Sequence, residues 1–371
     1  MAPLNKFVLS IACAAISLSG LANAEFNEDN TIYPLPNVGN LPIHDPAILR
    51  HPNGTYFAFK GGVHVPYYRS EHLNGTWEQV GTVLETDSII PNKKNATRPW
   101  APHVVERNGK FYCYYSLSQA GCRDSAIGVA TSDTLEPGSW KDYGALVATW
   151  SGKNSQISPY NISNAIDPTV LIDDDGKGYM TYGSYWSNIW ELPLSDTLLA
   201  IETPHHPDAR HLSFYPIEGQ PDHFTEPVPK CSDPQGVRHE EGSFLSKHNG
   251  TYYLWYAHGK CCDYSPLPEA GTEYSIRVGK SSNVAGPFVD KSGTPLLQGG
   301  GTTVYASNHG NIYAPGGPGI VAASGDVPQD ILVYHYLDRN VGLNFADTKL
   351  GYNYLTYDEE GWPIAHYDPI Q

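Results

Sequence analysis

The pattern that decides the fold first appears in Ile43-His44-Asp45-Pro46-Ala47-Ile48 and in the turn Asn53-Gly54-Thr55-Tyr56 that follows it. In this turn a polar residue and a glycine lead into a strand rich in tyrosine and phenylalanine, which is typical of a β-hairpin. The pattern recurs at Asn108-Gly109-Lys110-Phe111, Asp175-Gly176-Lys177-Gly178-Tyr179 and Asn249-Gly250-Thr251-Tyr252. Such repeats indicate the four-stranded blades of a β-propeller.

An acidic residue stands nine residues before three of the four glycines, and these acidic residues are Asp45, Asp167 and Glu241. Trp100 occupies the same position in the second copy. If the copies are equivalent units around an axis, three carboxylates and one indole point into one shared place. A site that cleaves carbohydrate needs ionisable oxygens on both sides of a bond and an aromatic wall.

The intervals between the repeats give the blade count. The four glycines are 55, 67 and 74 residues apart, and a fifth strand, 331–336, follows after a similar interval without a clear Asn-Gly or Asp-Gly turn. We therefore predict an all-β, five-bladed β-propeller; a β-sandwich with accidental similarity is the alternative. Residues 25–371 are treated as one domain, in which 25–40 lead into the first blade. Outer strands are expected after Gly75-Thr76-Trp77, Gly138-Ser139-Trp140 and Gly286-Pro287-Phe288, over 83–84, 146–147 and 295–297.

Composition excludes several classes of ligand. The 371-residue chain carries a formal net charge of −16, and this argues against nucleic acid and against acidic polymers as ligands. Only 17% of residues are charged, whereas 26 Tyr, 36 Gly and 30 Pro favour short strands and turns. No run after the first 24 residues is long and apolar enough to span a bilayer. We expect a monomer that acts on a neutral substrate, with no nucleic acid or membrane as partner.

Residues 1–24 have the pattern of a secretory signal peptide, with Lys6 at its start and the small-residue cleavage pattern Ala22-Asn23-Ala24 at its end. We therefore expect a secreted, extracellular protein, a retained membrane anchor being the alternative. Secretion permits disulfides and sugar attachment. Five cysteines follow the signal, so at least one is unpaired, and five sequons begin at Asn53, Asn74, Asn95, Asn161 and Asn249.

Each acidic motif also has a structural interpretation. An Asp-Pro pair entering a strand can simply cap a turn, but two such pairs in one register, with Glu241 in a third copy, favour a site. Glu240 is expected on the opposite side of its strand. The run Asp173-Asp174-Asp175-Gly176 lacks the later glutamate of a calcium loop and is interpreted as a hairpin turn.

Together these residues resemble glycoside hydrolase family 43 over nearly the whole chain after the signal. The resemblance depends on four motifs, His44-Asp45-Pro46, Trp100-Ala101-Pro102, 164–168 and Glu241-Gly242-Ser243, the last with serine where the family usually has proline. It implies an inverting hydrolase in which Asp45 is the general base, Glu241 the general acid, and Asp167 the residue that orients the acid and raises its pKa.

Within the family, the stretches 173–176 and 182–187, the pair Cys261-Cys262 and the stretch 311–317 look most like the endo-1,5-α-L-arabinanases. This resemblance implies internal cleavage of α-1,5-linked L-arabinan, a plant cell-wall polysaccharide. It also implies a structural Ca²⁺ in the channel with His335 as ligand, or else a packed histidine without metal; no organic cofactor is expected. Trp100, Tyr185 and Trp186 are candidates for stacking on sugar or for core packing. The alternatives for function are an exo-acting α-L-arabinofuranosidase or β-xylosidase and, more remotely, a non-catalytic carbohydrate-binding propeller.

Overall fold

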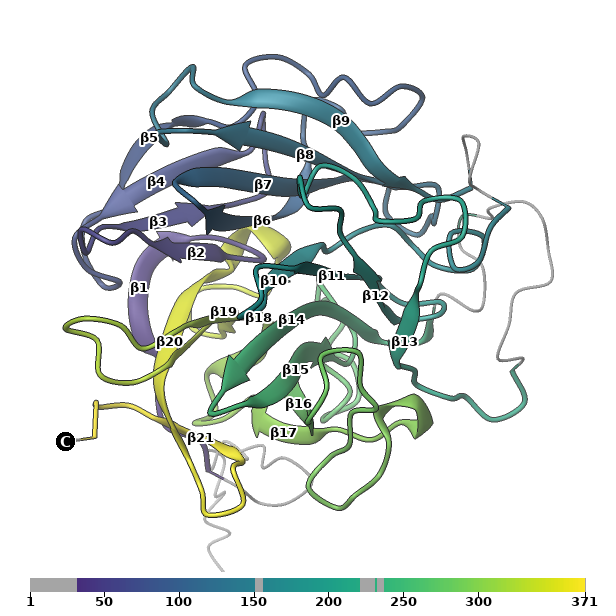
Figure 1. Cartoon of the computed structure of the whole chain (residues 1–371). Coiled ribbons are helices and arrows are strands. Elements are labelled where there is room, and N and C mark those ends of the chain that lie inside the picture. The colour runs from purple at the N-terminus through teal and green to yellow at the C-terminus, as the bar shows by residue number, and fades with distance from the viewer. Residues whose placement is uncertain (1–31, 151–155, 221–230, 232–236, 371) are drawn as a thin grey trace, which may run out of the picture.

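The computed structural model describes residues 32–150, 156–220, 231 and 237–370, so the expected signal segment 1–24 lies outside the described residues. Five antiparallel sheets surround a central axis (Figure 1). The inner strands β2, β6, β10 and β14 each contact the next, and β18 contacts both β14 and β2, so the ring is closed. This confirms the predicted five-bladed β-propeller.

The blades follow one another along the chain. Blade 1 is β2 (Ala47–Arg50), β3 (Tyr56–Phe59), β4 (Pro66–Ser70) and β5 (Glu78–Thr82). Blade 2 is β6 (Trp100–Arg107), β7 (Lys110–Leu117), β8 (Ala126–Ser132) and β9 (Lys141–Ala148). Blade 3 is β10 (Thr169–Ile172), β11 (Gly178–Tyr182), β12 (Ile189–Pro193) and β13 (Arg210–Ser213). Blade 4 is β14 (Glu240–His248), β15 (Thr251–His258), β16 (Ser275–Ser281) and β17 (Thr302–Tyr305).

Blade 5 joins the two ends of the chain. It contains β18 (Ile312–Val321), β19 (Ile331–Asp338) and β20 (Lys349–Tyr357), and the outer edge of β20 pairs with both β1 (Asn37–Pro42) and β21 (Pro363–His366). Figure 1 shows purple β1 beside yellow β20. Residues 25–40 were expected to lead into the first blade; of these, residues 37–40 belong to β1, an outer strand that closes the last blade.

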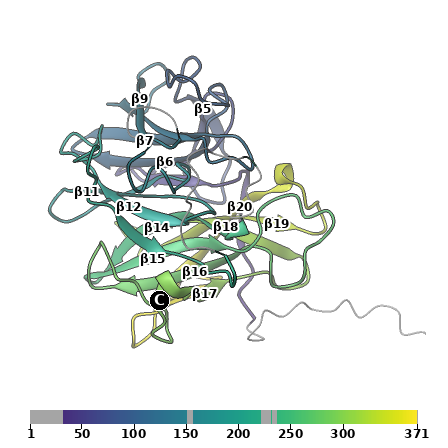
Figure 2. The ribbon, with the colours of Figure 1, turned by 90° about the vertical axis from the view of Figure 1, so that its right-hand side faces the viewer.

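The predicted Asn-Gly and Asp-Gly turns lie between the first and second strands of blades 1 to 4. The nine residues before each glycine therefore span the inner strand, and the residue at the start of that span lies where the inner strand begins. Figure 2 shows β14 and β18 near the middle of the molecule and β5, β9 and β17 toward its rim. This arrangement explains why one sequence offset brings side chains from several blades to one mouth of the ring.

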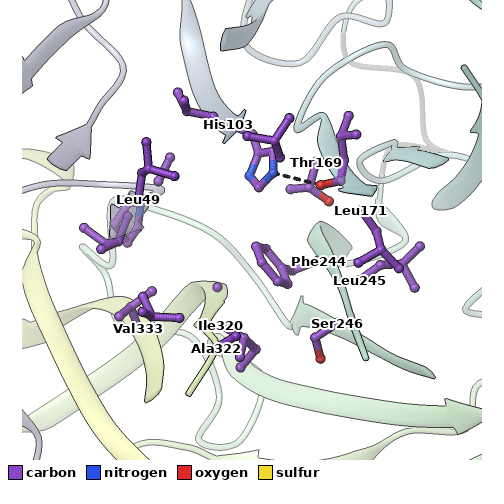
Figure 3. Close-up of a pocket in the computed structure, with 18 of the residues that line it drawn as sticks. Leu49, His103, Thr169, Leu171, Phe244, Leu245, Ser246, Ile320, Ala322 and Val333 are labelled. Carbon is purple, nitrogen blue, oxygen red and sulfur yellow. Dashed lines mark hydrogen bonds between the residues drawn. The ribbon is translucent and has the colours of Figure 1, made fainter. Parts of the chain in front are cut away.

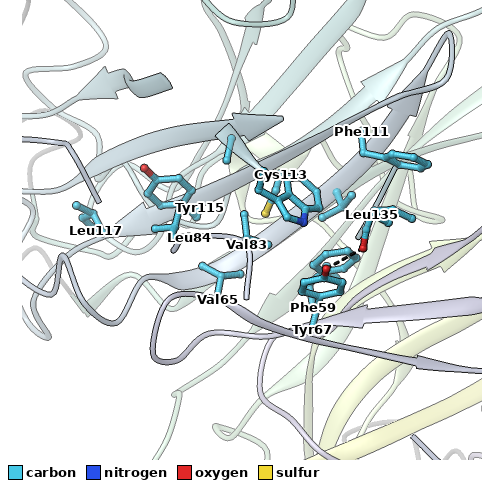
Figure 4. Packing of buried hydrophobic residues seen from close by; sticks show 14 of the residues in the cluster. Phe59, Val65, Tyr67, Val83, Leu84, Phe111, Cys113, Tyr115, Leu117 and Leu135 are labelled. Carbon is cyan, nitrogen blue, oxygen red and sulfur yellow. Dashed lines mark hydrogen bonds between the residues drawn. The ribbon is translucent and has the colours of Figure 1, made fainter. Parts of the chain in front are cut away.

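Five apolar clusters fill the spaces between successive blades. Between blades 1 and 2, the rings of Phe59 and Tyr67 stack 5.2 Å apart, and the Tyr67 hydroxyl donates to the carbonyl of Leu135 (Figure 4). Buried tyrosines with a satisfied hydroxyl contribute a large contact area without an unpaired polar group. The abundance of tyrosine in the sequence thus has its structural use at the blade interfaces.

The outer strands agree only in part with the ranges predicted from the sequence. Residues 146–147 lie in β9 as predicted, whereas 83–84 directly follow β5. In blade 4 the prediction was wrong, because Leu296 starts a short 3₁₀ helix, η2 (Leu296–Gln298), and the outer strand is β17. Leu296 is fully buried against blade 3, so tertiary packing decides its conformation. Within the described residues, no helix is both long and apolar enough to cross a membrane.

Candidate active site

One mouth of the ring holds a pocket with a volume of about 720 Å³. All five blades contribute to it through the connection between their second and third strands, namely 60–62, 118–122, 184–186, 261–263, and 345, 346 and 348. The starts of the inner strands form its floor, and Asp45, Asp167, Glu241 and Trp100 all line it. The structure therefore brings together the four positions that share the nine-residue offset.

Asp45 precedes β2 and has a left-handed backbone with φ of 46°, a conformation that aspartate tolerates better than most residues. Its amide N–H donates to Nδ1 of His335 over 3.1 Å. Its two carboxylate oxygens lie 3.5 Å from His335 Nδ1 and 3.6 Å from His44 Nε2. Burial raises the pKa of Asp45 to about 7.

Asp167 precedes β10 and also has a left-handed backbone, with φ of 56°. Its amide donates to the hydroxyl of Ser116, and its Oδ2 accepts the amide N–H of Gly242 over 3.2 Å. Only 8% of the residue is exposed. Burial, and then the charge of Asp45, raise the pKa of Asp167 well above its usual value, while the Gly242 amide opposes the shift.

Glu241 lies in β14, and two hydroxyl groups bind its carboxyl oxygens. Tyr274 donates to Oε1 and Ser184 donates to Oε2. Burial raises the pKa of Glu241, and the charges of Asp167 and Asp45 raise it further, against the opposing effect of the Ser184 hydroxyl. A carboxyl in such surroundings retains its proton to higher pH than a free glutamate does.

The neighbouring Glu240 points away from this group, as alternation along the strand predicts. It is fully buried, its Oε2 accepts the Ser213 hydroxyl, and its Oε1 lies 3.4 Å from Nδ1 of His258. Glu240 therefore has a structural role behind the pocket wall.

A second cavity, of about 550 Å³, follows the axis between the inner strands, and Asp45 and Asp167 border both cavities. Figure 3 shows its wall of mainly apolar side chains, including Leu49, Phe244 and Val333, with His103 among them. Asp45 and Asp167 thus lie at the mouth of a channel with low polarity, and this burial raises their pKa values.

Comparison with known proteins identifies the family. A profile of the glycosyl hydrolases family 43 matches residues 37–363. The chain belongs to glycosyl hydrolase family 43. Membership makes it a glycoside hydrolase. Such hydrolysis uses a pair of carboxyl groups, and this pocket holds three.

Three relatives of this family 43 enzyme illustrate the similarity. A protein of Emericella nidulans named probable arabinan endo-1,5-alpha-L-arabinosidase D is 46% identical over 339 residues, which cover 91% of this chain and 83% of that protein. The structure of the Cellvibrio cellulosa alpha-L-arabinanase has a TM-score of 0.72 at 26% identity and covers 88% of this chain and 96% of its own. The structure of an exo-1,5-alpha-L-arabinanase from a bovine ruminal metagenomic library has a TM-score of 0.71 at 25% identity and covers 90% of this chain and 99% of its own.

The three aromatic candidates of the family 43 enzyme all line the pocket. Trp100 and Tyr185 are half-buried, whereas Trp186 is 5% exposed. The Tyr185 hydroxyl accepts the amide N–H of Cys261 over 3.1 Å, so this side chain is fixed at the wall. Trp100 and Tyr185 expose more surface to a sugar than Trp186 does, but their role as contacts stays a prediction.

His335 can accommodate the cation that the resemblance implies in only one of its two neutral tautomers. Burial, and then neighbouring His44, lower its pKa, so the ring is neutral. If Nδ1 accepts the Asp45 amide, Nε2 carries the proton and offers no lone pair. If Nδ1 instead donates to Oδ1 of Asp45, 3.5 Å away, Nε2 is free to bind a metal, an arrangement common among metal-binding histidines. His44, Asp45 and His335 form a group whose ligand atoms all lie within 4.8 Å of one another.

Several residues of this site gave no usable signal in the sequence. Ser184 belongs to a stretch noted only for its resemblance to the family, and Tyr274 was not singled out at all, yet both bind Glu241. Gly317 in β18 has φ of 56°, and a Cβ there would lie 2.7 Å from Oδ1 of Asp45. Because Gly317 of blade 5 has no side chain, there is room beside it for the carboxylate of Asp45 in blade 1.

Proposed function

We propose that this family 43 enzyme hydrolyses α-1,5-linked L-arabinan at internal bonds, with inversion at the anomeric carbon. The observation that carries the proposal is the convergence of Asp45, Asp167 and Glu241 on one pocket. The names of the relatives support the substrate, since the Emericella nidulans protein is named for arabinan, and the Cellvibrio cellulosa alpha-L-arabinanase was also solved with arabinohexaose. A neutral polysaccharide also suits a chain with a net charge of −16.

In the proposed mechanism, Asp45 removes a proton from a water molecule as the water attacks the anomeric carbon. Glu241 gives its proton to the departing glycosidic oxygen, so the bond breaks and each chain end carries a hydroxyl. Asp167 does not react; burial first, and then the negative charge of Asp167, raise the pKa of Glu241, which is the direction that an acid requires. The hydroxyls of Ser184 and Tyr274 hold the acid in position.

The products formed early from debranched arabinan test the internal mode of cleavage. The relatives named for endo cleavage support a chain that crosses the mouth of the pocket, so we expect a ladder of oligosaccharides and a rapid fall in viscosity. Chromatography of samples taken below about 5% conversion measures this. Arabinose or one short product alone, with long chains intact, would favour exo cleavage, the activity named for one structural neighbour.

A Ca²⁺ ion held by His335 is a further part of the proposal. A bound cation would add positive charge beside Asp45 and so favour its ionised form. If the ion is present, chelation should lower the melting temperature, and Ca²⁺ at about 100 times its Kd should restore about 2.7 kcal/mol. The His335→Gln variant should lose this response, and Mg²⁺ serves as the control ion. Unchanged melting after verified metal removal would favour a packed histidine.

We also propose that the protein is secreted and acts as a monomer. The pattern of residues 1–24 supports export, as do the disulfides Cys122–Cys231 and Cys261–Cys262, while Cys113 is free and buried. Of the five sequon asparagines, all but the half-buried Asn161 are exposed. N-terminal sequencing of protein from a culture medium, light scattering and glycosidase digestion test these points.

A further inference from the structure

Two loops from neighbouring blades form one wall of the pocket. The β15–β16 loop of blade 4 contributes the disulfide between the adjacent residues Cys261 and Cys262, and the β19–β20 loop of blade 5 contributes Phe345. In a five-membered ring the boundary between blades 4 and 5 lies across the axis from blade 2, which carries Trp100. A sugar at the mouth therefore has Trp100 on one side and this wall on the other.

Contacts between the two loops hold this wall together. Asp263 accepts the amide N–H of Phe345 over 3.3 Å, and the amide of Tyr264 donates to the carbonyl of Leu343 over 3.3 Å. Cys261 and Leu343 also pack against one buried cluster formed by residues of both blades: Ala257, Tyr264, Tyr274, Tyr313, Ala314 and Leu337. Since the loops share a core, the disulfide and Phe345 present a preorganised surface.

Phe345 is the unusual member of the wall, because 51% of this aromatic residue is exposed although it lines the pocket. Its ring contacts His44, with 4.3 Å between the ring centroids, and its helix η3 (Phe345–Asp347) is fixed by a capping box between Asn344 and Asp347. An aromatic ring that is held in place yet left exposed in a pocket is suited to a ligand with an apolar face.

The wall is also close to the catalytic groups on both sides. Cys262 Sγ lies 3.8 Å from Nε2 of His44, the residue before the proposed base. On the other side, the amide of Cys261 donates to the hydroxyl of Tyr185, the residue that directly follows Ser184, whose hydroxyl binds the proposed acid. The wall therefore contacts residues next to Asp45 on one side and next to the Ser184 partner of Glu241 on the other.

We propose that the Cys261–Cys262 disulfide and Phe345 form a sugar-binding subsite that contacts the apolar C–H face of an arabinofuranosyl residue of the substrate. This inference deepens the proposed function and depends on it for the identity of the sugar. The disulfide presents sulfur atoms and no charge to the sugar, and Phe345 supplies the flat ring. The wall would thus add affinity for the chain without taking part in proton transfer.

The test measures binding separately from catalysis. In an Asp45→Asn background, isothermal titration with arabinohexaose should show binding on the order of tenfold weaker after Phe345→Ala, and several-fold weaker after the double change Cys261→Ser and Cys262→Ser. Phe345→Trp should preserve binding. Val341→Ala and Leu267→Ala are matched controls, because these residues are 65% and 49% exposed in the same two loops but do not line the pocket. Both controls should bind as the background does.

The outcomes separate this inference from the proposed function. If the unmodified enzyme does not cleave arabinan and the Asp45→Asn protein does not bind arabinohexaose, the proposed function fails. If the unmodified enzyme cleaves arabinan but Phe345→Ala changes neither the Kd nor the KM, the subsite is overturned. A fall in melting temperature and kcat with unchanged Kd would also overturn it, since Phe345 would then only support His44.

Discussion

Replacing Asp45 with asparagine is expected to lower kcat on arabinan by between about 100-fold and 10,000-fold, the usual contribution of a general base. An amide cannot take the proton from the attacking water, so the loss should be just as large on aryl glycosides with good leaving groups. The substitution keeps the backbone N–H that donates to His335, and so the fold should persist. Initial rates on both substrates, with melting temperature as the check on folding, measure this.

Chemical rescue provides a sharper test of the role of Asp45. Azide is already a nucleophile and needs no base, so added azide should restore cleavage of an aryl glycoside by the Asp45→Asn variant. The product should be an arabinofuranosyl azide of inverted configuration, with the aryl alcohol as the other product. Asp167→Asn is the comparison variant, because its loss should come from a misplaced, less effective acid and should not respond to azide. Activity of Asp45→Asn within tenfold of the unmodified enzyme would contradict the assignment.

The sequence predicted the convergence of the carboxylates because local geometry alone sets it. In each of these blades, nine residues that span the inner strand separate the residue at its start from the glycine of the turn. An equal offset in the sequence therefore becomes an equivalent position in the ring. Asp45 and Asp167 also share the left-handed backbone that redirects the chain at the start of β2 and β10. No long-range information was needed for either residue.

Long-range contacts decide the features that the sequence did not predict. The edge of β20 selects β1 as its partner, and nothing within Asn37–Pro42 itself specifies pairing with a strand about 310 residues later. Tyr274 reaches Glu241 from the far end of a loop whose course depends on the packing of blade 4 against blade 5. The need for glycine at position 317 is evident only from its contact with Asp45 in the fold. Such residues are defined by what faces them, and that is known only from the fold.

Replacing Glu241 with glutamine is expected to separate substrates by the quality of their leaving group. Arabinan has a poor leaving group that must be protonated, so kcat should fall by between about 100-fold and 10,000-fold. A dinitrophenyl glycoside leaves without protonation, so its hydrolysis should fall by less than about tenfold. Glutamine has nearly the same shape, and the hydroxyls of Ser184 and Tyr274 can bind its amide, so the pocket should be preserved.

The pH profile of the same variant tests why the acid works. Burial and the charges of Asp167 and Asp45 raise the pKa of Glu241, and the acid acts only while protonated, so kcat/KM of the unmodified enzyme should fall as pH rises through that raised pKa. Glutamine does not titrate, so this alkaline limb should be absent from the residual activity on the dinitrophenyl glycoside. In Asp167→Asn one of the charges that raises the pKa is gone, and the alkaline limb should move to lower pH. An equal loss on both substrates in Glu241→Gln, or an alkaline limb that neither variant alters, would assign the acid to another residue.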